Sequence, residues 1–270
     1  MIEFQSVTKT YADESVAVDD FSYTVPSHRT VVLVGSSGSG KTTLLRMVNR
    51  MLDPTSGAVM IDGQNVRSLD KVRLRRSIGY VLQAGGLLPH RTVLDNVATV
   101  PVLNGTSKRQ ARSTALEMLE RVGLSTELAV RYPAQLSGGQ QQRVGVARAL
   151  AGAPDILLLD EPFGAVDPIV RTGLQEELRR LQADLGKTIV FVTHDIDEAF
   201  ALGDEVVVLR SGGRIAQTGT PAHLLAHPAD DFVRQFIGSD SAKRTLRIEQ
   251  LEGRQIVVDR DGRPAGLLAP

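Results

Sequence analysis

The chain reads Gly35-Ser36-Ser37-Gly38-Ser39-Gly40-Lys41-Thr42 directly after the apolar run Thr30 to Val34. This stretch matches GxxxxGK[ST], the P-loop, whose glycines let backbone N–H groups converge on the α- and β-phosphates of a nucleotide. Lys41 is then expected to reach the β- and γ-phosphates, and the Thr42 hydroxyl to ligate Mg²⁺. The motif predicts a nucleoside-triphosphate site, but kinases, GTPases and recombinases share it, so other parts of the chain must distinguish them.

Size, charge and cysteine content narrow the possible classes of protein. With 270 residues, of which 42% are hydrophobic, the chain can bury a full core as one large domain, or as one domain with a small appendage. Lys plus Arg equals Asp plus Glu at 31 each, so the basic footprint of a nucleic-acid-binding protein is missing and no nucleic-acid partner is expected. The chain has no cysteine, so catalysis must rest on carboxylates, histidine, lysine and backbone amides.

The apolar stretches are short. The longest, such as Ile156 to Leu159 and Val206 to Leu209, are strand-sized, far below the ~20 residues that a membrane-spanning helix needs. The N-terminus, Met1 to Val7, alternates as a strand does and lacks the basic-then-apolar layout of a signal peptide. We therefore expect a cytosolic chain that does not cross a membrane by itself.

Short β-branched runs that end in small or polar residues recur along the chain. They are Val31 to Val34, Ile78 to Leu82, Ile156 to Leu159, Thr188 to Thr193 and Glu205 to Leu209. Their continuous hydrophobicity favours parallel strands buried on both faces. Helical patterns lie between them; in Arg171 to Leu185, leucines form one stripe and Gly186 ends the pattern. The alternation predicts an α/β layered core.

Two regions depart from this alternation. From about Leu87 to Pro133 the periodicity is helical and no strand is expected. The segment up to about Thr24 indicates antiparallel strands, and so does Met51 to Val66, with turns at Asp53-Pro54 and Asp62-Gly63. The sequence thus predicts a helical insertion and an antiparallel β subdomain beside the core.

Asp160 and Glu161 follow the expected strand Ile156 to Leu159 at its C-terminal end, where α/β sheets place ligand-contacting groups. In a P-loop ATPase, Asp160 would hold Mg²⁺ directly or through water, and Glu161 would orient and polarise the attacking water. The alternative is a solvated pair of carboxylates in a turn next to Pro162. The P-loop upstream favours the catalytic interpretation.

Three further residues are Tyr11, Gln83 and His194. None of them indicates a function when it is considered alone. An isolated histidine that closes a strand is more often exposed or hydrogen-bonded than catalytic. Gln83 also follows a strand, and Tyr11 lies among polar residues as a surface aromatic would. Only the order in which they occur with the other motifs points to a function.

Taken in order, these segments resemble the motifs of ATP-binding-cassette (ABC) ATPases over roughly residues 1 to 238. The family signature LSGGQ excludes most of the other classes of protein that share the P-loop. The matching positions are Tyr11 for the A-loop, Gly35 to Thr43 for Walker A, Gln83 for the Q-loop, Leu136 to Gln140 for the signature, Ile156 to Glu161 for Walker B, Gly164 to Asp167 for the D-loop and His194 for the H-loop. The resemblance implies an α/β fold with a P-loop NTPase (RecA-like) core, an antiparallel β subdomain and a helical signature subdomain at about residues 87 to 150.

The family mechanism implies a role for each matching position. Two copies would pair head to tail, with ATP between the Gly35 to Thr43 loop of one and Ser137, Gly138, Gly139 and Gln140 of the other. Tyr11 would stack on adenine, and His194 would contact the γ-phosphate. Gln83 would sense Mg²⁺ and the attacking water while coupling to the membrane partner. Asp167 would bridge the subunits near Ser37. Because LSGGQ runs into a helical pattern, its backbone donors are expected to open a helix whose dipole favours the γ-phosphate.

Several stretches resemble the importer ATPases of the quaternary-amine group, which serve glycine betaine, choline and carnitine. They are Val48 to Arg50 with Pro54 to Gly57, Gly86 to His90, Glu161 to Pro168 and Gly186 to Ala199. The resemblance implies an integral-membrane permease that docks near residues 84 to 98, an extracytoplasmic substrate-binding protein, and a peripheral position on the cytoplasmic face of the membrane. Because the cargo never touches this chain, its identity is an analogy.

Members of that group often continue into paired regulatory (CBS) domains, whereas only residues 241–270 follow Asp240 here. The segment Arg254 to Leu268 resembles the opening strand and turn of such a domain, with Asp261-Gly262 as a hairpin turn. We expect residues 239–270 to be a short tail. It would be the remnant of a regulatory region, an added strand on the core or its dimer, or a partly ordered end.

Two other functions stay open. A soluble cassette ATPase acting in DNA repair, translation or cofactor assembly would usually carry a long coiled-coil insert or two cassettes in one chain, and this sequence has neither. A transporter for amino acids, sulfonates or phosphonates, or one that works in the opposite direction, is the nearer alternative.

Overall fold

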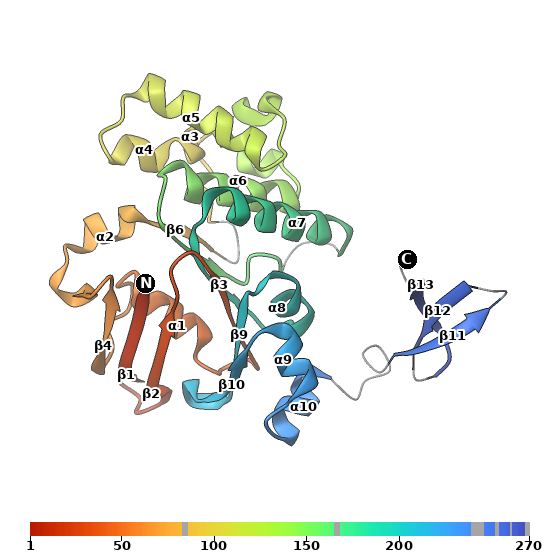
Figure 1. Cartoon of the computed structure of the whole chain (residues 1–270). Coiled ribbons are helices and arrows are strands. Elements are labelled where there is room, and N and C mark those ends of the chain that lie inside the picture. Colours follow the sequence, from red (N-terminus) through yellow and green to blue (C-terminus); the bar gives the residue numbers. More distant parts are fainter. Residues whose placement is uncertain (83–85, 165–167, 239–245, 252–253, 260, 268–270) are drawn as a thin grey trace.

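The structure is a computed structural model that describes residues 1–82, 86–164, 168–238, 246–251, 254–259 and 261–267 (Figure 1). A six-stranded sheet of order β10-β9-β3-β8-β7-β6 forms its centre. The strands are β3 (Thr30–Gly35), β6 (Ile78–Val81), β7 (Ile156–Asp160), β8 (Thr188–Thr193), β9 (Glu205–Leu209) and β10 (Ile215–Gly219). Neighbours are parallel except β9 and β10. These strands confirm the prediction of parallel strands that was made from the apolar runs. β3, β7 and β8 are buried along their whole length.

Alternate residues of the central strands enter two separate hydrophobic cores. On β3, Val31 and Leu33 belong to one core, and Val32 and Val34 to the other. The first core is shared with α1 (Lys41–Val48) and with the antiparallel sheet described next, and the second with the helical layer. The central sheet is therefore covered on both faces, which explains its continuous hydrophobicity.

A four-stranded antiparallel sheet, β2-β1-β4-β5, lies beside α1 (Figure 1). Its strands are β1 (Ile2–Thr10), β2 (Val16–Val25), β4 (Ser56–Ile61) and β5 (Gln64–Asn65), and η1 (Val66–Ser68) and α2 (Lys71–Ser77) lead from it to β6. Phe4 meets Phe21 edge-on, with ring centroids 5.2 Å apart. Asp62 and Gly63 make the expected turn between β4 and β5, with φ of 48° and 76°.

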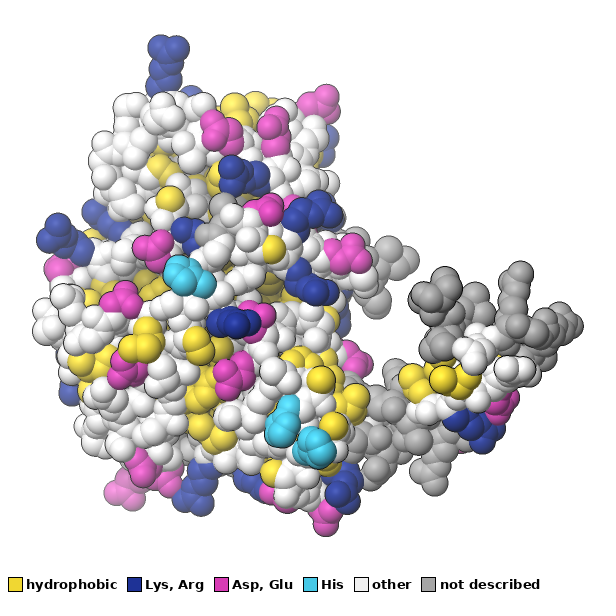
Figure 2. Space-filling model, viewed as in Figure 1, with side chains coloured by type: hydrophobic (Ala, Val, Ile, Leu, Met, Phe, Trp, Pro, Cys, Tyr) yellow, Lys and Arg dark blue, Asp and Glu magenta, His cyan; other side chains and the backbone are white. Residues whose placement is uncertain are grey.

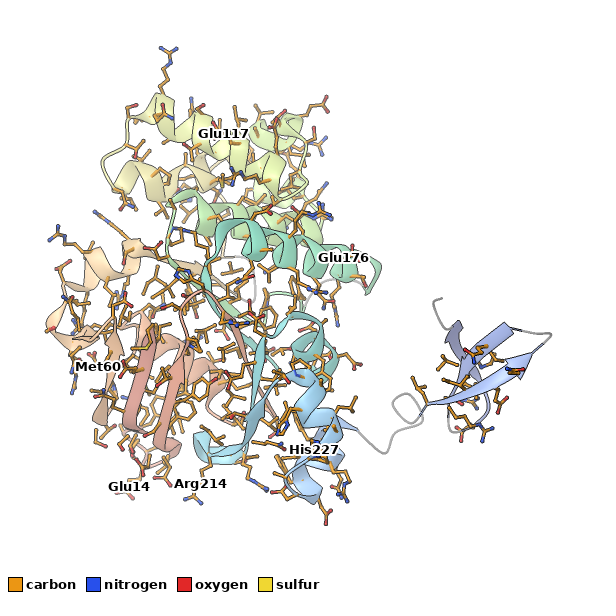
Figure 3. The ribbon with its side chains drawn as sticks, viewed as in Figure 1. Glu14, Met60, Glu117, Glu176, Arg214 and His227 are labelled. Carbon is orange, nitrogen blue, oxygen red and sulfur yellow. The ribbon has the colours of Figure 1, made fainter. Side chains whose placement is uncertain are left out.

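Helices form a layer at the top of Figure 1. They are α3 (Val93–Val97), α4 (Thr99–Leu103), α5 (Lys108–Arg121), η2 (Thr126–Val130), η3 (Pro133–Gln135), α6 (Gly138–Ala151) and α7 (Pro168–Leu185). Figure 3 labels Glu117 on α5 and Glu176 on α7 in this layer, and Met60 on β4 in the antiparallel sheet. Gly186 ends α7 with φ of 56°, as the sequence predicts. The parallel core sheet and the antiparallel sheet confirm the predicted α/β fold class.

The C-terminal part holds α8 (Ile196–Leu202), η4 (Ser211–Gly213), α9 (Pro221–Ala226), α10 (Asp231–Ile237), β11 (Arg247–Leu251), β12 (Arg254–Val258) and β13 (Pro264–Leu267). The last three strands form a sheet of their own rather than adding a strand to either of the other sheets in the described residues. The chain turns between β12 and β13 at Gly262, whose φ is 80°. The segment thus makes the hairpin turn that its sequence indicates.

Charged side chains of both signs are interspersed over the face shown in Figure 2. Within the described residues, no helix combines the length and the apolar character that crossing a bilayer requires.

Candidate active site

The strand order brings three separate segments to one edge of the central sheet. β3 and β7 both pair with β8, so the carboxyl ends of three neighbouring parallel strands lie together. The P-loop follows β3, Asp160 and Glu161 lie at the end of β7, and His194 follows β8. Residues far apart in the sequence therefore share one site.

Glycines give the P-loop its shape. Gly38 and Gly40 have φ of 79° and 85°, in the left-handed region that favours glycine. A Cβ at Gly35 would lie 2.6 Å from the Leu209 carbonyl oxygen, and one at Gly40 would lie 2.5 Å from that of Ala17. The loop therefore packs directly against the backbone of β9 and β2, and only glycine fits at these two positions.

Lys41 is folded back into its own loop. Its Nζ donates to the carbonyl oxygens of Gly35 and Ser36, both at 2.8 Å, and to Ser39 Oγ at 3.2 Å. Burial lowers the pKa of this ammonium below its ordinary value, and the carboxylates at the end of β7 oppose that effect. Lys41 is thus held by neutral oxygens, and it lies close enough to Asp160 and Glu161 for their negative charges to stabilise its ammonium.

Thr42 and Asp160 meet at the sheet edge. Thr42 Oγ1 donates to Asp160 Oδ1 at 2.8 Å, and Tyr80 OH donates to Asp160 Oδ2 at 3.1 Å. Asp160 is only 5% exposed. Mg²⁺ prefers oxygen ligands, and one or two protein ligands suffice because it keeps several waters and binds substrate phosphates. The Thr42 hydroxyl and the Asp160 carboxylate therefore fit a magnesium ion that arrives with a nucleotide.

Glu161 and His194 lie against each other. His194 Nδ1 is 3.2 Å from Glu161 Oε2, and the glutamate side chain is 21% exposed against 61% for the histidine. Glu161 has φ of 43°, an unfavourable value for a residue with a side chain, and its N–H bonds to the Val192 carbonyl at 2.9 Å. Such backbone strain clusters at functional sites. The pair is therefore a shielded carboxylate with an imidazole on its outer side.

A buried network supports the backbone on either side of His194. Thr193 Oγ1 donates to Glu198 Oε2 at 2.7 Å and accepts from the Asp195 N–H at 3.0 Å. Arg171 on α7 lies 3.6 Å from the carboxylates of both Asp195 and Glu198. Burial raises the pKa of Glu198, and the bond from Thr193 and the charge of Arg171 act against that rise. The network ties the first turns of α7 to the segment that carries the histidine.

Tyr11 lies just beyond β1, beside the P-loop helix. Its hydroxyl oxygen is 3.5 Å from Thr43 Oγ1, and Lys9 Nζ lies 5.6 Å from the centre of its ring. The side chain is 42% exposed, so part of the ring is open to a stacking partner.

The signature residues open helix α6, as the sequence predicts. Ser137 Oγ accepts from the Gln140 N–H at 3.3 Å, and Gln140 Oε1 accepts from the Ser137 N–H at 3.0 Å. This reciprocal capping box satisfies two amides. The N–H groups of Gly138 and Gly139 have no acceptor within the helix because they belong to its first turn. They are therefore available to a ligand outside the helix.

The structure gathers some of the predicted residues and separates others. The P-loop, Asp160, Glu161 and His194 share one edge, with Tyr11 beside it. No hydrogen bond or ion pair in the described part of the chain joins residues 137–140 to the P-loop. Gln83 and Asp167, predicted for the Q-loop and the D-loop, lie outside the described residues.

Sequence reasoning did not single out Tyr80 or Glu198. Each has the ordinary look of its element, a β-favouring residue in a strand and an acidic residue in the first turn of a helix. The one available signal was for Tyr80, which lies near the C-terminal end of a parallel strand, as Asp160 does.

Comparison with known proteins agrees with this site. The pattern of the family described as ABC transporter matches residues 18–164. The choline transport ATP-binding protein OpuBA of Bacillus subtilis is 46% identical over 95% of this chain. The carnitine transport ATP-binding protein OpuCA of Listeria monocytogenes is 48% identical over 89%, and the glycine betaine uptake system ATP-binding protein YehX of Escherichia coli is 48% identical over 93%. The chain spans 68%, 60% and 81% of these three relatives.

Solved structures of related chains share the fold. A dimeric post-hydrolysis state of the ATP-binding cassette MJ0796, bound to ADP and Pi, has a TM-score of 0.75 at 36% identity, over 82% of this chain and 99% of that one. The cbiO1 protein of Clostridium perfringens, part of the ABC transporter complex cbiONQ, has a TM-score of 0.76 at 29% identity, over 83% of this chain and 90% of that one. The motifs, the fold and these similarities agree: the chain belongs to the ABC transporter family.

Proposed function

We propose that this chain is the ATP-hydrolysing subunit of an importer for a quaternary-amine osmoprotectant such as glycine betaine, choline or carnitine. The meeting of the P-loop, Asp160, Glu161 and His194 at one sheet edge carries the ATPase part. The cargo rests on relatives that are 46 to 48% identical over most of this chain and are named for the transport of these solutes.

Each side chain of the site has a defined task in hydrolysis. Lys41 exchanges the carbonyl oxygens of its own loop for the β- and γ-phosphates. Thr42 and Asp160 would hold Mg²⁺, which would supply positive charge against these phosphates. Glu161 takes a proton from the attacking water as general base. His194 lies on the outer side of that carboxylate, where it can contact the γ-phosphate.

A second copy of the chain completes each site. The Gly138 and Gly139 amides have no partner in their own helix, and α6 adds its positive N-terminal dipole. In a head-to-tail dimer, these donors would face the γ-phosphate held by the P-loop of the other copy. The related cassette MJ0796, which is dimeric, supports this arrangement.

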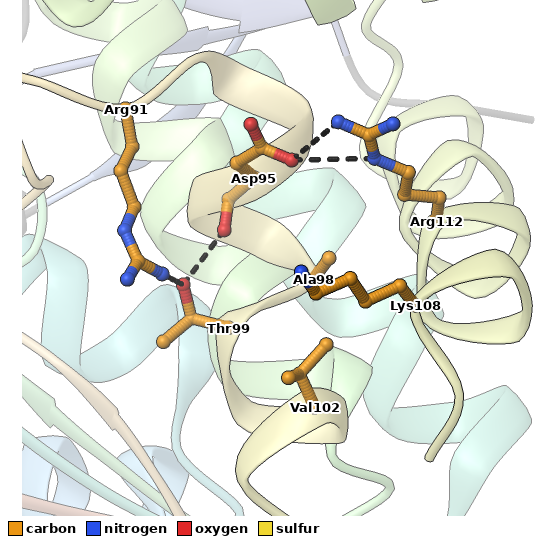
Figure 4. Close-up of a pocket in the computed structure, with 7 residues that line it drawn as sticks. All are labelled: Arg91, Asp95, Ala98, Thr99, Val102, Lys108 and Arg112. Carbon is orange, nitrogen blue, oxygen red and sulfur yellow. Dashed lines mark hydrogen bonds and ion pairs between the residues drawn. The ribbon is translucent and has the colours of Figure 1, made fainter.

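The membrane partner docks on the helical layer. This layer holds a pocket of about 420 Å³. It is lined by Arg91, Asp95, Ala98, Thr99, Val102, Lys108 and Arg112 (Figure 4). Asp95 is paired with Arg112 at 2.9 Å, so Arg91 and Lys108 leave the pocket with a net positive charge. The pocket lies close in sequence to Gln83, the residue expected to couple the nucleotide to the permease. We therefore place the permease here, the chain on the cytoplasmic face of the membrane, and a substrate-binding protein on the other side.

Uptake of labelled glycine betaine at high osmolarity tests the proposal. Cells that lack any other betaine route carry the wild-type chain, Glu161→Gln, or the control Glu176→Gln, which alters an exposed carboxylate on α7. Loss of uptake with Glu161→Gln alone supports an importer driven by this subunit. No uptake with any of the three chains would refute the betaine cargo, and parallel assays with labelled amino acids, sulfonates and phosphonates would then identify the solute.

A further inference from the structure

The carboxylate of Asp160 has a partner on each oxygen. Thr42 donates to Oδ1, and the phenol of Tyr80 donates to Oδ2 at 3.1 Å. In the parallel register of β6 and β7, Tyr80 pairs with Leu158. Asp160 lies two residues beyond Leu158 and therefore projects from the same face of the sheet. The sheet itself, rather than a loop, places the phenol against the carboxylate.

The direction of this bond follows from the chemistry of the two groups. An ionised carboxylate can only accept, whereas the phenol carries one proton that it can donate. Tyr80 is therefore the donor and Asp160 the acceptor.

We propose that Tyr80 is a positioning residue for the magnesium site, which holds the plane of the Asp160 carboxylate so that Oδ1 stays toward Thr42 and the metal. The inference rests on the magnesium site of the proposed function. The terminal torsion of aspartate is broad, so without the phenol the carboxylate plane can turn and carry Oδ1 away from the metal position. Partners that orient metal-holding carboxylates typically account for about 10- to 100-fold in metal affinity or activity.

Replacement of Tyr80 by phenylalanine isolates the hydroxyl, because the ring and its packing stay. Tyr23→Phe is the matched control: Tyr23 is half-buried as Tyr80 is, but it lies on β2 with its ring 6.3 Å from that of Phe21. Both variants lose one phenol oxygen from a partly buried site, and only one of them loses it at Asp160.

Binding of Mn²⁺ to the full chain in the presence of ADP, followed by the electron paramagnetic resonance signal of free Mn²⁺, tests the inference. We expect Tyr80→Phe to raise the Kd for Mn²⁺ about ten-fold, with unchanged ADP affinity in the presence of EDTA and with Tyr23→Phe equal to wild type. Equal Mn²⁺ affinity in wild type and Tyr80→Phe would overturn this inference and leave the proposed function intact. If wild type bound no Mn²⁺ with ADP, the magnesium site of the proposed function would fall, and the inference with it.

Thermal unfolding separates a positioning role from a structural one. A purely structural role for Tyr80 would lower the unfolding temperature of Tyr80→Phe without changing its Kd for Mn²⁺.

Discussion

His194 Nδ1 lies 3.2 Å from Glu161 Oε2, and the two side chains differ in exposure, at 61% and 21%. The glutamate belongs to the end of β7 and the histidine to the segment after β8, so the contact joins two neighbouring strands of the sheet. Glu161 is the inner member of the pair and His194 the outer one. This difference in exposure fits the proposed role of Glu161 as general base, because the glutamate is better shielded from solvent than His194.

Glu161→Gln should bind ATP and dimerise but hydrolyse ATP slowly. The amide has the shape of the carboxylate but cannot act as a base, so we expect turnover to fall by about 10²- to 10⁴-fold. Phosphate release measures turnover, and gel filtration with ATP measures dimerisation. Glu176→Gln controls for the loss of a charge on the surface, and wild-type turnover in Glu161→Gln would exclude Glu161 as the base.

Lys41 should make the stability of the nucleotide-free chain depend on pH. Burial lowers the pKa of its ammonium in the folded state, so the unfolded chain keeps this proton to a higher pH than the folded chain does. Where the unfolded state binds more protons, the free energy of unfolding rises with pH. Between the lowered pKa and the ordinary value of 10.5, wild type should therefore gain stability relative to Lys41→Met.

Denaturant unfolding of wild type and Lys41→Met at a series of alkaline pH values measures this difference. The subtraction removes the other lysines, which titrate in both chains. A difference in the free energy of unfolding that stayed constant or fell over this window would contradict the prediction.

The sequence predicted the elements that local physics dictates. Continuous apolar runs became the parallel strands because only burial on both faces suits them, and Gly186 ended α7 because it adopts a positive φ. The order of the strands could not be predicted in this way, since β8 reaches its place between β3 and β7 only through tertiary packing. That order is what brings His194 to Glu161.

Contacts made by residues of ordinary appearance were also beyond prediction. The bond from Tyr80 to Asp160 spans 80 positions, and nothing in the strand pattern of Tyr80 indicates a polar partner. Motifs predicted the residues that would touch the nucleotide, and these roles stay predictions. The side chains that hold those residues in place became visible only in the fold.

Removal of residues 239–270 should leave the cassette folded and active. Helix α10 already ends at Gly238, which has φ of 64° and caps the helix through its backbone N–H. The sheet formed by β11, β12 and β13 joins neither of the other sheets in the described residues. We expect the truncated chain to keep the unfolding midpoint and the ATP turnover of the full chain. A lower midpoint would show that the third sheet packs on the cassette.

Gly138→Asp should abolish ATP turnover without loss of stability. Gly138 is not among the glycines with positive φ, so a side chain fits its backbone. An acidic residue in the first turn of α6 interacts favourably with the helix dipole, by about 0.3–1 kcal/mol. The same charge repels a γ-phosphate brought by a second copy. Thermal unfolding and phosphate release measure the two effects. Retained turnover would show that the signature residues do not contribute to the hydrolytic site.

Mixing Lys41→Met with Gly138→Asp should restore part of the activity that each variant lacks alone. In a head-to-tail dimer, each site takes its P-loop from one copy and its signature from the other, so a mixed dimer has one site with both motifs intact. With free exchange of subunits, half of the dimers are mixed, and roughly a quarter of the wild-type number of sites returns. Single-turnover hydrolysis measures the intact sites. If mixed dimers form, as tagged pull-down would show, and no hydrolysis returns, the two motifs do not act across the dimer.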